Sequence, residues 1–193
     1  LNEGIKNRVE YIRKLIALYF RFSLLDESFN IILNGERITL NELQDLLGHT
    51  QLLRTINNTK DPFVKDHIKE QESLRNSKNI NIDYDGIHGF IASVDKPSML
   101  KVRGTDEKAT IDLYVNGRLR EKDILKHIPT ARIVESYLYG QIHYDNLDDS
   151  SDRFTSSREG IVPDDPKFKG LLDELSKLLK TILKDWDNWR LEL

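Results

Sequence analysis

The feature that most constrains the fold is a long amphipathic stretch near the carboxyl end of the chain. Apolar side chains recur at helical spacing from residue 168 to residue 189, which predicts one helix of roughly 40 Å at about 1.5 Å per residue. Asp164-Asp165-Pro166 precedes it and supplies a cap candidate, acidic charge at the positive helix end and a proline in the first turn. The wide apolar stripe favours packing in the core of the same domain over a coiled coil.

Strands alternate with short helical segments ahead of this helix. Val, Ile and Tyr are frequent in the segment 131–144, which predicts a central strand. Asn116-Gly117 predicts a tight turn, and Pro129 ends a short helix that begins near residue 121. Further strands are predicted at 80–84, 86–94 and 109–115. This order indicates an α+β fold, an α/β sandwich in which a mixed sheet carries a short crossover helix and the long carboxyl-terminal helix.

The amino-terminal part has its own pattern of helix, strand and turn. Apolar residues at helical spacing predict a helix over about residues 5–24, and residues 29–33 predict a strand closed by Asn34-Gly35. Thr39 or Asn41 can cap a short helix from residue 40 to residue 47. Residues 60–79 are strongly charged and are expected to form a loop or a weak helix.

Composition excludes several classes of protein. The 193 residues include no cysteine, which excludes disulfides and cysteinyl metal sites and favours a cytoplasmic protein. The sequence contains no apolar run of membrane-spanning length, and its first residues are polar and charged, unlike a secretory signal. A net charge of −3 argues against strong nucleic-acid binding, although a local basic patch is compatible with it.

Motifs for metal binding and nucleophilic catalysis are missing. The five histidines lie at scattered positions without a His-x-x-x-His pair, so structural roles are favoured for them. The acidic run 145–152 lacks the glycine and the final glutamate of a calcium loop. The sequence has no Gly-x-Ser-x-Gly elbow for a nucleophilic serine.

A loop between the predicted central strand and the last helix contains the main candidate residue, Arg158. Loops held between rigid elements often carry function. From composition alone, an exposed arginine or an ion pair with Asp148, Asp149 or Asp152 is the favoured interpretation of Arg158.

Three blocks follow one another at consistent spacing in the second half of the chain. The first, Thr110–Arg118, contains Val-Asn-Gly-Arg and is similar to a strand–turn–helix of the second domain of MutL mismatch-repair proteins. The second, Tyr139–Asp149, resembles the strand and acidic turn that precede the third. The third, Ser156–Ile161, is similar to a Ser-Arg-Glu stretch in the middle domain of the ninety-kilodalton heat-shock chaperones. Together they resemble the transducer domain of the GHKL superfamily of ATPases over roughly residues 80–190.

The resemblance implies a domain division and a site. It makes residues 1–40 the last helix and strand of a nucleotide-binding domain, 41–79 a connecting segment and 80–193 a transducer-type βαβ domain. Arg158, with Ser157, would reach the γ-phosphate of ATP when the domains close, with Arg153 and Lys167 as alternatives.

The same resemblance implies a dependence on parts outside this chain. ATP and Mg²⁺ would bind in the full-length protein and not to this fragment alone, since the chain lacks an Asp-x-Gly-x-Gly adenine loop. The implied partners are an amino-terminal nucleotide-binding domain of the same protein and, as an option left open, a second copy of the chain. The fragment would couple ATP hydrolysis to domain motion and be inactive by itself.

Two other functions remain open from the residues. The long helix, with Trp186 and Trp189 near its end, can serve as a protein-interaction or dimerisation module without any nucleotide. A nucleic-acid role would require one basic face. That face would be assembled from Lys6, Arg8, Arg13, Lys14, Lys101, Arg103, Arg118 and Arg120.

Overall fold

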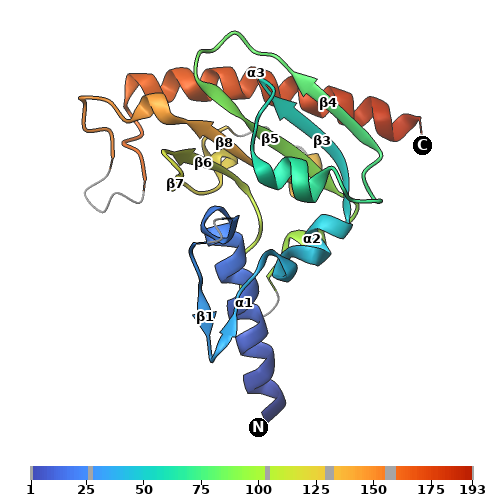
Figure 1. The fold of residues 1–193 in the computed structure, drawn as a ribbon. Coiled ribbons are helices and arrows are strands. Elements are labelled where there is room, and N and C mark those ends of the chain that lie inside the picture. Colours follow the sequence, from blue (N-terminus) through green and yellow to red (C-terminus); the bar gives the residue numbers. More distant parts are fainter. Residues whose placement is uncertain (1, 26–27, 103–104, 129–132, 155–159, 193) are drawn as a thin grey trace.

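The structure is a computed structural model that describes residues 2–25, 28–102, 105–128, 133–154 and 160–192, although the side chains of residues 2–7, 22, 23 and 133 are not described. It is built on one mixed sheet of six strands, in the spatial order β4-β3-β5-β8-β6-β7. The long helix α3 (Pro166–Leu191) covers one face of this sheet, and helix α1 (Asn2–Leu25) meets the opposite face with its carboxyl-terminal end (Figure 1). The predicted α+β class, mixed sheet and long carboxyl-terminal helix are therefore confirmed, while the finer transducer arrangement stays a prediction.

β5 and β8, which are far apart in the sequence, form the centre of the sheet. β5 (Ile87–Val94) pairs antiparallel with β3 (Thr50–Ile56) on one side and with β8 (Leu138–Tyr144) on the other. β8 in turn pairs in parallel with β6 (Ile111–Val115), which forms a hairpin with β7 (Arg118–Glu121). The expectation of a central strand within residues 131–144 is confirmed by β8. The strand begins at residue 138, because residues 133–137 form a 3₁₀ helix, η5 (Ile133–Tyr137).

The other edge of the sheet differs from the prediction. β4 (Asn76–Ile80) pairs in parallel with β3, so a strand lies within the region expected to be a loop, and residues 81–84 lie beyond its end. A π-helical turn, η2 (Val64–Ile68), lies in the connection between the two strands. The division of the chain into 1–40, 41–79 and 80–193 stays a prediction, with β3 and β4 joined to the same sheet as the strands that follow them.

The remaining elements are short. β1 (Ile32–Leu33) and β2 (Glu36–Arg37) form a separate hairpin beside α1, with Asn34 and Gly35 at positive φ as the turn signal predicts. Thr39 caps η1 (Leu40–Leu43), which continues into α2 (Gln44–Gly48). The 3₁₀ helices η3 (Pro97–Leu100), η4 (Ile124–His127) and η6 (Asp145–Leu147) occupy loops, so the helix expected over 121–127 is a single 3₁₀ turn.

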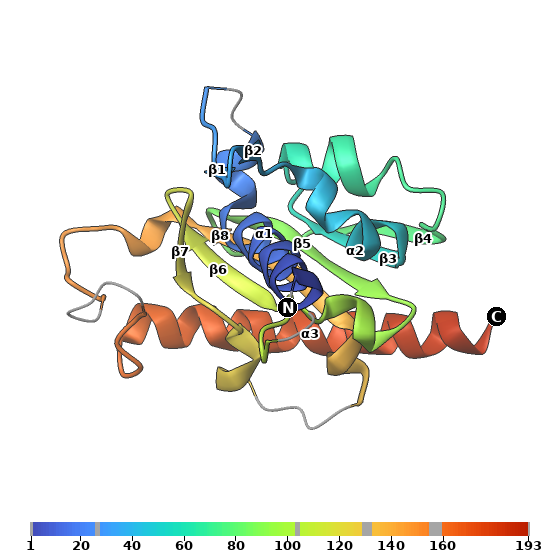
Figure 2. The same ribbon diagram turned by 90° about the horizontal axis from the view of Figure 1, so that it is seen from below.

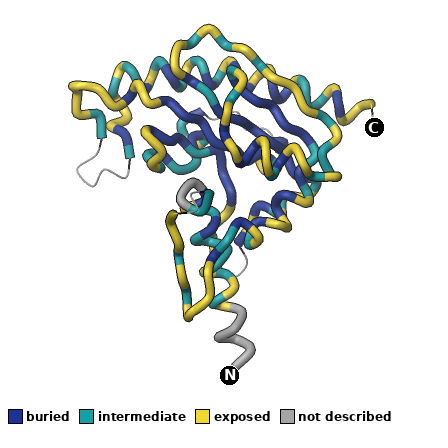
Figure 3. Tube along the Cα trace, viewed as in Figure 1, coloured by how far each residue is buried: buried dark blue, intermediate teal, exposed yellow. Residues whose placement is uncertain are grey.

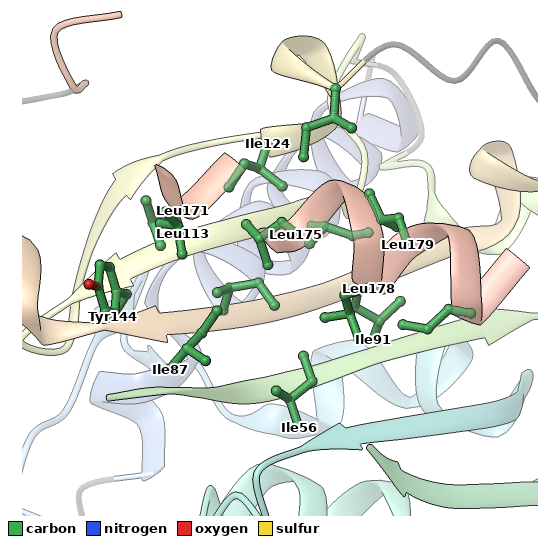
Figure 4. Packing of buried hydrophobic residues seen from close by; sticks show 14 of the residues in the cluster. Ile56, Ile87, Ile91, Leu113, Ile124, Tyr144, Leu171, Leu175, Leu178 and Leu179 are labelled. Atoms are coloured by element: carbon green, nitrogen blue, oxygen red, sulfur yellow. The ribbon is translucent and has the colours of Figure 1, made fainter. Parts of the chain in front are cut away.

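The sheet separates two hydrophobic cores, which Figure 3 shows as buried segments on both of its faces. On the α3 side, alternate residues of the strands pack against the apolar stripe of α3, including Leu171, Leu175 and Leu179 (Figure 4). On the other side, α2, η2 and the carboxyl-terminal part of α1 pack over Leu53, Phe90 and neighbouring residues. Asp165 caps α3 by accepting a hydrogen bond from the Phe168 N–H at 2.8 Å, which confirms the predicted start of the helix.

Figure 2, turned by 90°, is seen from the side of α1, which lies in front of the sheet, and Figure 1 shows the amino terminus of α1 projecting from the body of the protein. α1 contains a break in helical geometry at Phe20, where φ is −113° and ψ is 20°. In the described part of the chain, the helices lack the length and apolar content needed to cross a membrane.

Two glycines bring the central strands unusually close. A Cβ on Gly89, whose φ is +145°, would lie 2.0 Å from the carbonyl oxygen of Gln141, and a Cβ on Gly140 would lie 2.3 Å from that of Phe90. Both contacts are with backbone atoms of a central strand, which has little freedom to move away.

We expect Gly140→Ala to lower the free energy of unfolding by about 1–3 kcal/mol or more, because the added methyl group overpacks the β5–β8 pair. Urea unfolding measures the change. Gly48→Ala is the matched control, since a Cβ at Gly48 meets nothing within 4 Å. Equal stability of the two variants would contradict the close approach of the strands.

Candidate functional site

The carboxyl-terminal end of α1 is attached to the sheet by a buried charge. Arg21 is only 4% exposed, and its Nη2 donates a hydrogen bond of 3.0 Å to Oδ2 of Asp61. Its guanidinium carbon also lies 4.1 Å from the centre of the Phe63 ring, in cation–π geometry. Asp61 lies just before η2 and also accepts the Phe63 N–H at 2.9 Å, so the carboxylate is held from two directions.

Two histidines extend this ion pair towards the surface. His88 on β5 and His143 on β8 are register partners, and their rings stack with centroids 4.7 Å apart and planes within 5°. His143 is buried with Nε2 at 3.8 Å from Oδ2 of Asp61, while the half-buried His88 places Nδ1 3.1 Å from Oγ1 of Thr59. We call Arg21, Asp61, His88 and His143 the arginine–histidine cluster.

Burial and neighbouring charges set the protonation of this cluster. Burial alone raises the pKa of Asp61, but the adjacent His143 and Arg21 and the Phe63 N–H overcome it and lower that pKa to about 2. Burial, together with the neighbouring His143, lowers the pKa of His88 below its ordinary value. Asp145 and Asp61 act on His88 in the opposite sense and are outweighed. The cluster therefore holds an ionised carboxylate and a neutral His88 at neutral pH.

A second polar group lies on the same face of the sheet, beneath Tyr19 of α1. Asp112 on β6 accepts a hydrogen bond from Thr110, and Lys122 donates to Oγ1 of Thr110 at 3.2 Å. Glu107 accepts a 2.8 Å hydrogen bond from the Tyr19 hydroxyl and lies 3.6 Å from Nζ of Lys122. Burial raises the pKa of Asp112, partly offset by its hydrogen bonds. These contacts attach α1 to the sheet at a second point.

A small cavity of about 30 Å³ lies between the two groups. Its volume suits about one water molecule. Arg21, Asp112 and Gln141 are its charged and amide residues, and Oε1 of Gln141 has no hydrogen-bond partner among the described residues. Tyr139 and Phe90 are among its apolar lining residues. The two polar groups can thus position α1, and His88 can take up a proton. The helix α1 covers the part of the sheet where these groups lie.

Metal-binding geometry is not found in the described residues, which contain no group of three or more His, Cys, Asp or Glu side chains able to hold an ion. The histidines have structural contacts. His49, for example, places Nδ1 2.9 Å from Oδ1 of Asp95.

The residues expected to meet a nucleotide are only partly described. Arg158 and Ser157 lie in the segment 155–159, outside the described residues, so their assignment is not tested. Arg153 and Lys167, the alternatives to Arg158, both form ion pairs. Nε of Arg153 lies 3.0 Å from Oδ1 of Asp165, and Nζ of Lys167 lies 3.2 Å from Oδ2 of Asp149. Arg153 also pairs with Asp149.

Several residues of the proposed interaction surfaces have partners within the protein, and Arg103 lies outside the described residues. Trp189 is buried, and Trp186 packs against Tyr137 and Arg190 rather than extending as a free contact. Arg13, Lys14 and Lys101 do line one groove beside α1. That groove is also lined by Glu10, Glu36, Glu42 and Asp45. Because Arg13 pairs with Glu36 and Glu42, the groove is mixed in charge and is not a basic face.

The arginine–histidine cluster has no signal in the sequence. Its four residues come from α1, the β3–β4 connection, β5 and β8, and nothing in their spacing predicts that they meet.

Comparison with known proteins gives one informative relative. The chain is 26% identical over 197 aligned residues to "Putative type II restriction enzyme HgiDII" from Herpetosiphon aurantiacus, an alignment that covers 100% of this chain and 31% of the relative. The chain therefore spans about a third of the length of the curated relative it matches. Models of known families do not match the chain, and neither do solved structures.

This similarity corrects the interpretation drawn from the three sequence blocks. The GHKL ATPase family, the ATP-coupled transducer function and the partnership with an amino-terminal nucleotide-binding domain are wrong, because the relative is described as a restriction enzyme. The interaction-module alternative gains no support from it either. The expectation of ATP and Mg²⁺ in a longer protein stays a prediction.

The turn geometry gives a physical reason for the misleading resemblance. Asn116 and Gly117 both have positive φ, 50° and 71°, which a two-residue hairpin turn requires of any protein. The Val-Asn-Gly-Arg block is therefore explained by the β6–β7 hairpin alone.

We expect Asp61→Asn to lower the free energy of unfolding by about 3–5 kcal/mol, because it leaves the Arg21 guanidinium buried without its carboxylate. Arg21→Met/Asp61→Asn should recover part of this loss, since it leaves no unpaired charge. The control Glu174→Gln removes a surface ion pair with Lys177 and should cost about 0.5 kcal/mol or less. A loss for Asp61→Asn as small as that of the control, measured by urea unfolding, would contradict the role of the buried pair.

The stability of the protein should also depend on pH through His88. An unfolded histidine has a pKa of about 6.5. Because the folded pKa is lower, the unfolded chain binds a proton first as pH falls below that value, and the free energy of unfolding decreases. Asp61 acts in a separate window: its stabilising contribution is lost as pH falls from near 3.8 to about 2. Urea midpoints between pH 8 and pH 3 test this, with His88→Asn expected to remove only the upper step.

Proposed function

We propose that this chain is part of a DNA-acting protein of the restriction-enzyme type. The observation that carries the proposal is the similarity to HgiDII, which extends over 100% of this chain rather than over one motif. A match confined to a turn or to one helix would be explained by local structure, whereas an alignment that includes the residues of both cores supports a relationship over the whole chain.

Within such a protein, the role assigned to this chain is to hold DNA and not to cut it. Arg21 and Asp61 are buried where α1 meets the sheet, so these two charged groups do not face a phosphodiester of duplex DNA. The relative is about three times as long as the aligned part, so the proposal places strand cleavage with the whole protein.

The net charge of the chain determines how DNA binding should behave. With 29 basic and 32 acidic residues, the protein as a whole repels DNA, and binding requires a local group of cations. Contacts made through phosphates weaken steeply as salt rises, because counterions compete for them.

Fluorescence anisotropy with a labelled DNA duplex tests this proposal. We expect saturable binding at about 50 mM salt that weakens by at least tenfold at about 200 mM. An acidic polypeptide such as polyglutamate, added as competitor at equal charge concentration, should displace the duplex poorly. Failure of the chain to bind duplex DNA at the lower salt concentration would contradict the proposal.

A further inference from the structure

The solvent-facing side of α3 carries a row of lysines. Lys177, Lys180 and Lys184 are all exposed and follow one another at three and four residues, which places them on one side of the helix over about 10 Å. Lys177 contacts Glu174 at 2.7 Å, and its side chain remains 71% exposed. In the described part of the chain, Lys180 and Lys184 have no ion pair. We call these three residues the lysine row.

One of the acidic residues beside this row, Asp185, is turned away from it. Asp185 follows Lys184 directly, but its Oδ2 accepts a 3.0 Å hydrogen bond from Nε of Arg54, whose side chain is 1% exposed on β3. Because Arg54 holds this carboxylate against the sheet, Asp185 neutralises a buried cation and not the lysine row. Asp173, four residues before Lys177, and Asp187, three residues after Lys184, lie at the two ends of the row, and the three lysines form the cationic stretch between them.

The neighbouring edge strand adds another cation. Lys78 on β4 is the register partner of Arg54, so both side chains lie on the α3 face of the sheet. Nη1 of Arg54 donates to Oδ1 of Asn76 on the same strand at 2.8 Å, which links β4, β3 and α3 through one guanidinium. Lys78 is exposed, and the positive surface therefore continues from α3 onto the edge of the sheet.

We propose that the lysine row, together with Lys78, contacts the phosphate backbone of duplex DNA, an inference that rests on the proposed DNA-acting function. Each lysine is a flexible point charge, suited to a phosphate rather than to the planar edge of a base. The contact is therefore independent of base sequence and sets where α3 lies along the duplex.

The test compares two triple variants that change the net charge equally. Lys177→Gln/Lys180→Gln/Lys184→Gln removes the lysine row. Lys60→Gln/Lys65→Gln/Lys69→Gln removes three exposed lysines around η2, which belongs to the core on the opposite face of the sheet. Far-ultraviolet circular dichroism and urea midpoints check that both variants fold as the unmodified protein does.

Binding of a labelled duplex is then measured at several salt concentrations. The row variant should weaken binding at least tenfold and reduce the slope of log affinity against log salt by about 1 for each phosphate that a lysine no longer neutralises. The η2 variant should bind within about twofold of the unmodified protein. Replacing the three row lysines by arginine should preserve binding, because the charge is kept.

The failures of the two proposals are distinguishable. If the unmodified protein binds DNA and both glutamine variants bind it equally well, the lysine row does not touch the duplex, while the proposed function stands. If the unmodified protein does not bind duplex DNA, the proposed function and this inference fall together. Binding of anionic phosphatidylserine vesicles in place of duplex DNA would overturn the inference by identifying a membrane surface as the partner.

Discussion

The buried contact between Arg21 and Asp61 determines how the amino-terminal helix is joined to the rest of the protein. A buried arginine such as Arg21 is stable only with its carboxylate in place, so the position of α1 depends on the connection between β3 and β4. That connection is in turn fixed by the parallel pairing of β3 with β4 and by Phe63, Val64 and Ile68 in the core beneath it. The charge of Arg21 therefore links α1 to the connection between β3 and β4, the edge of the sheet that the sequence did not predict.

The two faces of the sheet use different physical means to hold their helices. α3 is held by an apolar stripe against the alternate strand residues, with Arg54 and Asp185 as the notable polar contact. α1 adds to its apolar contacts, such as Ala17 in the second core, two sets of polar contacts: the arginine–histidine cluster and the hydrogen bond from Tyr19 to Glu107. Apolar packing tolerates small displacements at a continuous cost, whereas buried polar contacts require defined partners and protonation states. The α1 attachment therefore responds to pH through His88 and Asp61.

Sequence reasoning succeeded where local chemistry determines structure. The Asp165 cap, the Asn34-Gly35 turn and the carboxyl-terminal helix follow from neighbouring residues and were predictable. β4 was missed because Asn76–Ile80 is an edge strand whose largely polar side chains give no hydrophobic alternation. The buried cluster was missed because its members are brought together by strand order. The ATPase interpretation failed because it used a turn motif that any hairpin of this type favours.

The position of β8 has a consequence for how the chain reaches its native state. This strand is the last to appear along the sequence, yet it lies between β5 and β6 and pairs with both. During synthesis, β5 and the β6–β7 hairpin are complete before β8 exists, and each then has an open edge of unpaired backbone groups. The sheet can close only when residues 138–144 insert between them, so contacts distant in sequence must form late. A chain that ends before residue 138 would leave the facing edges of β5 and β6 unpaired, and unpaired strand edges favour aggregation.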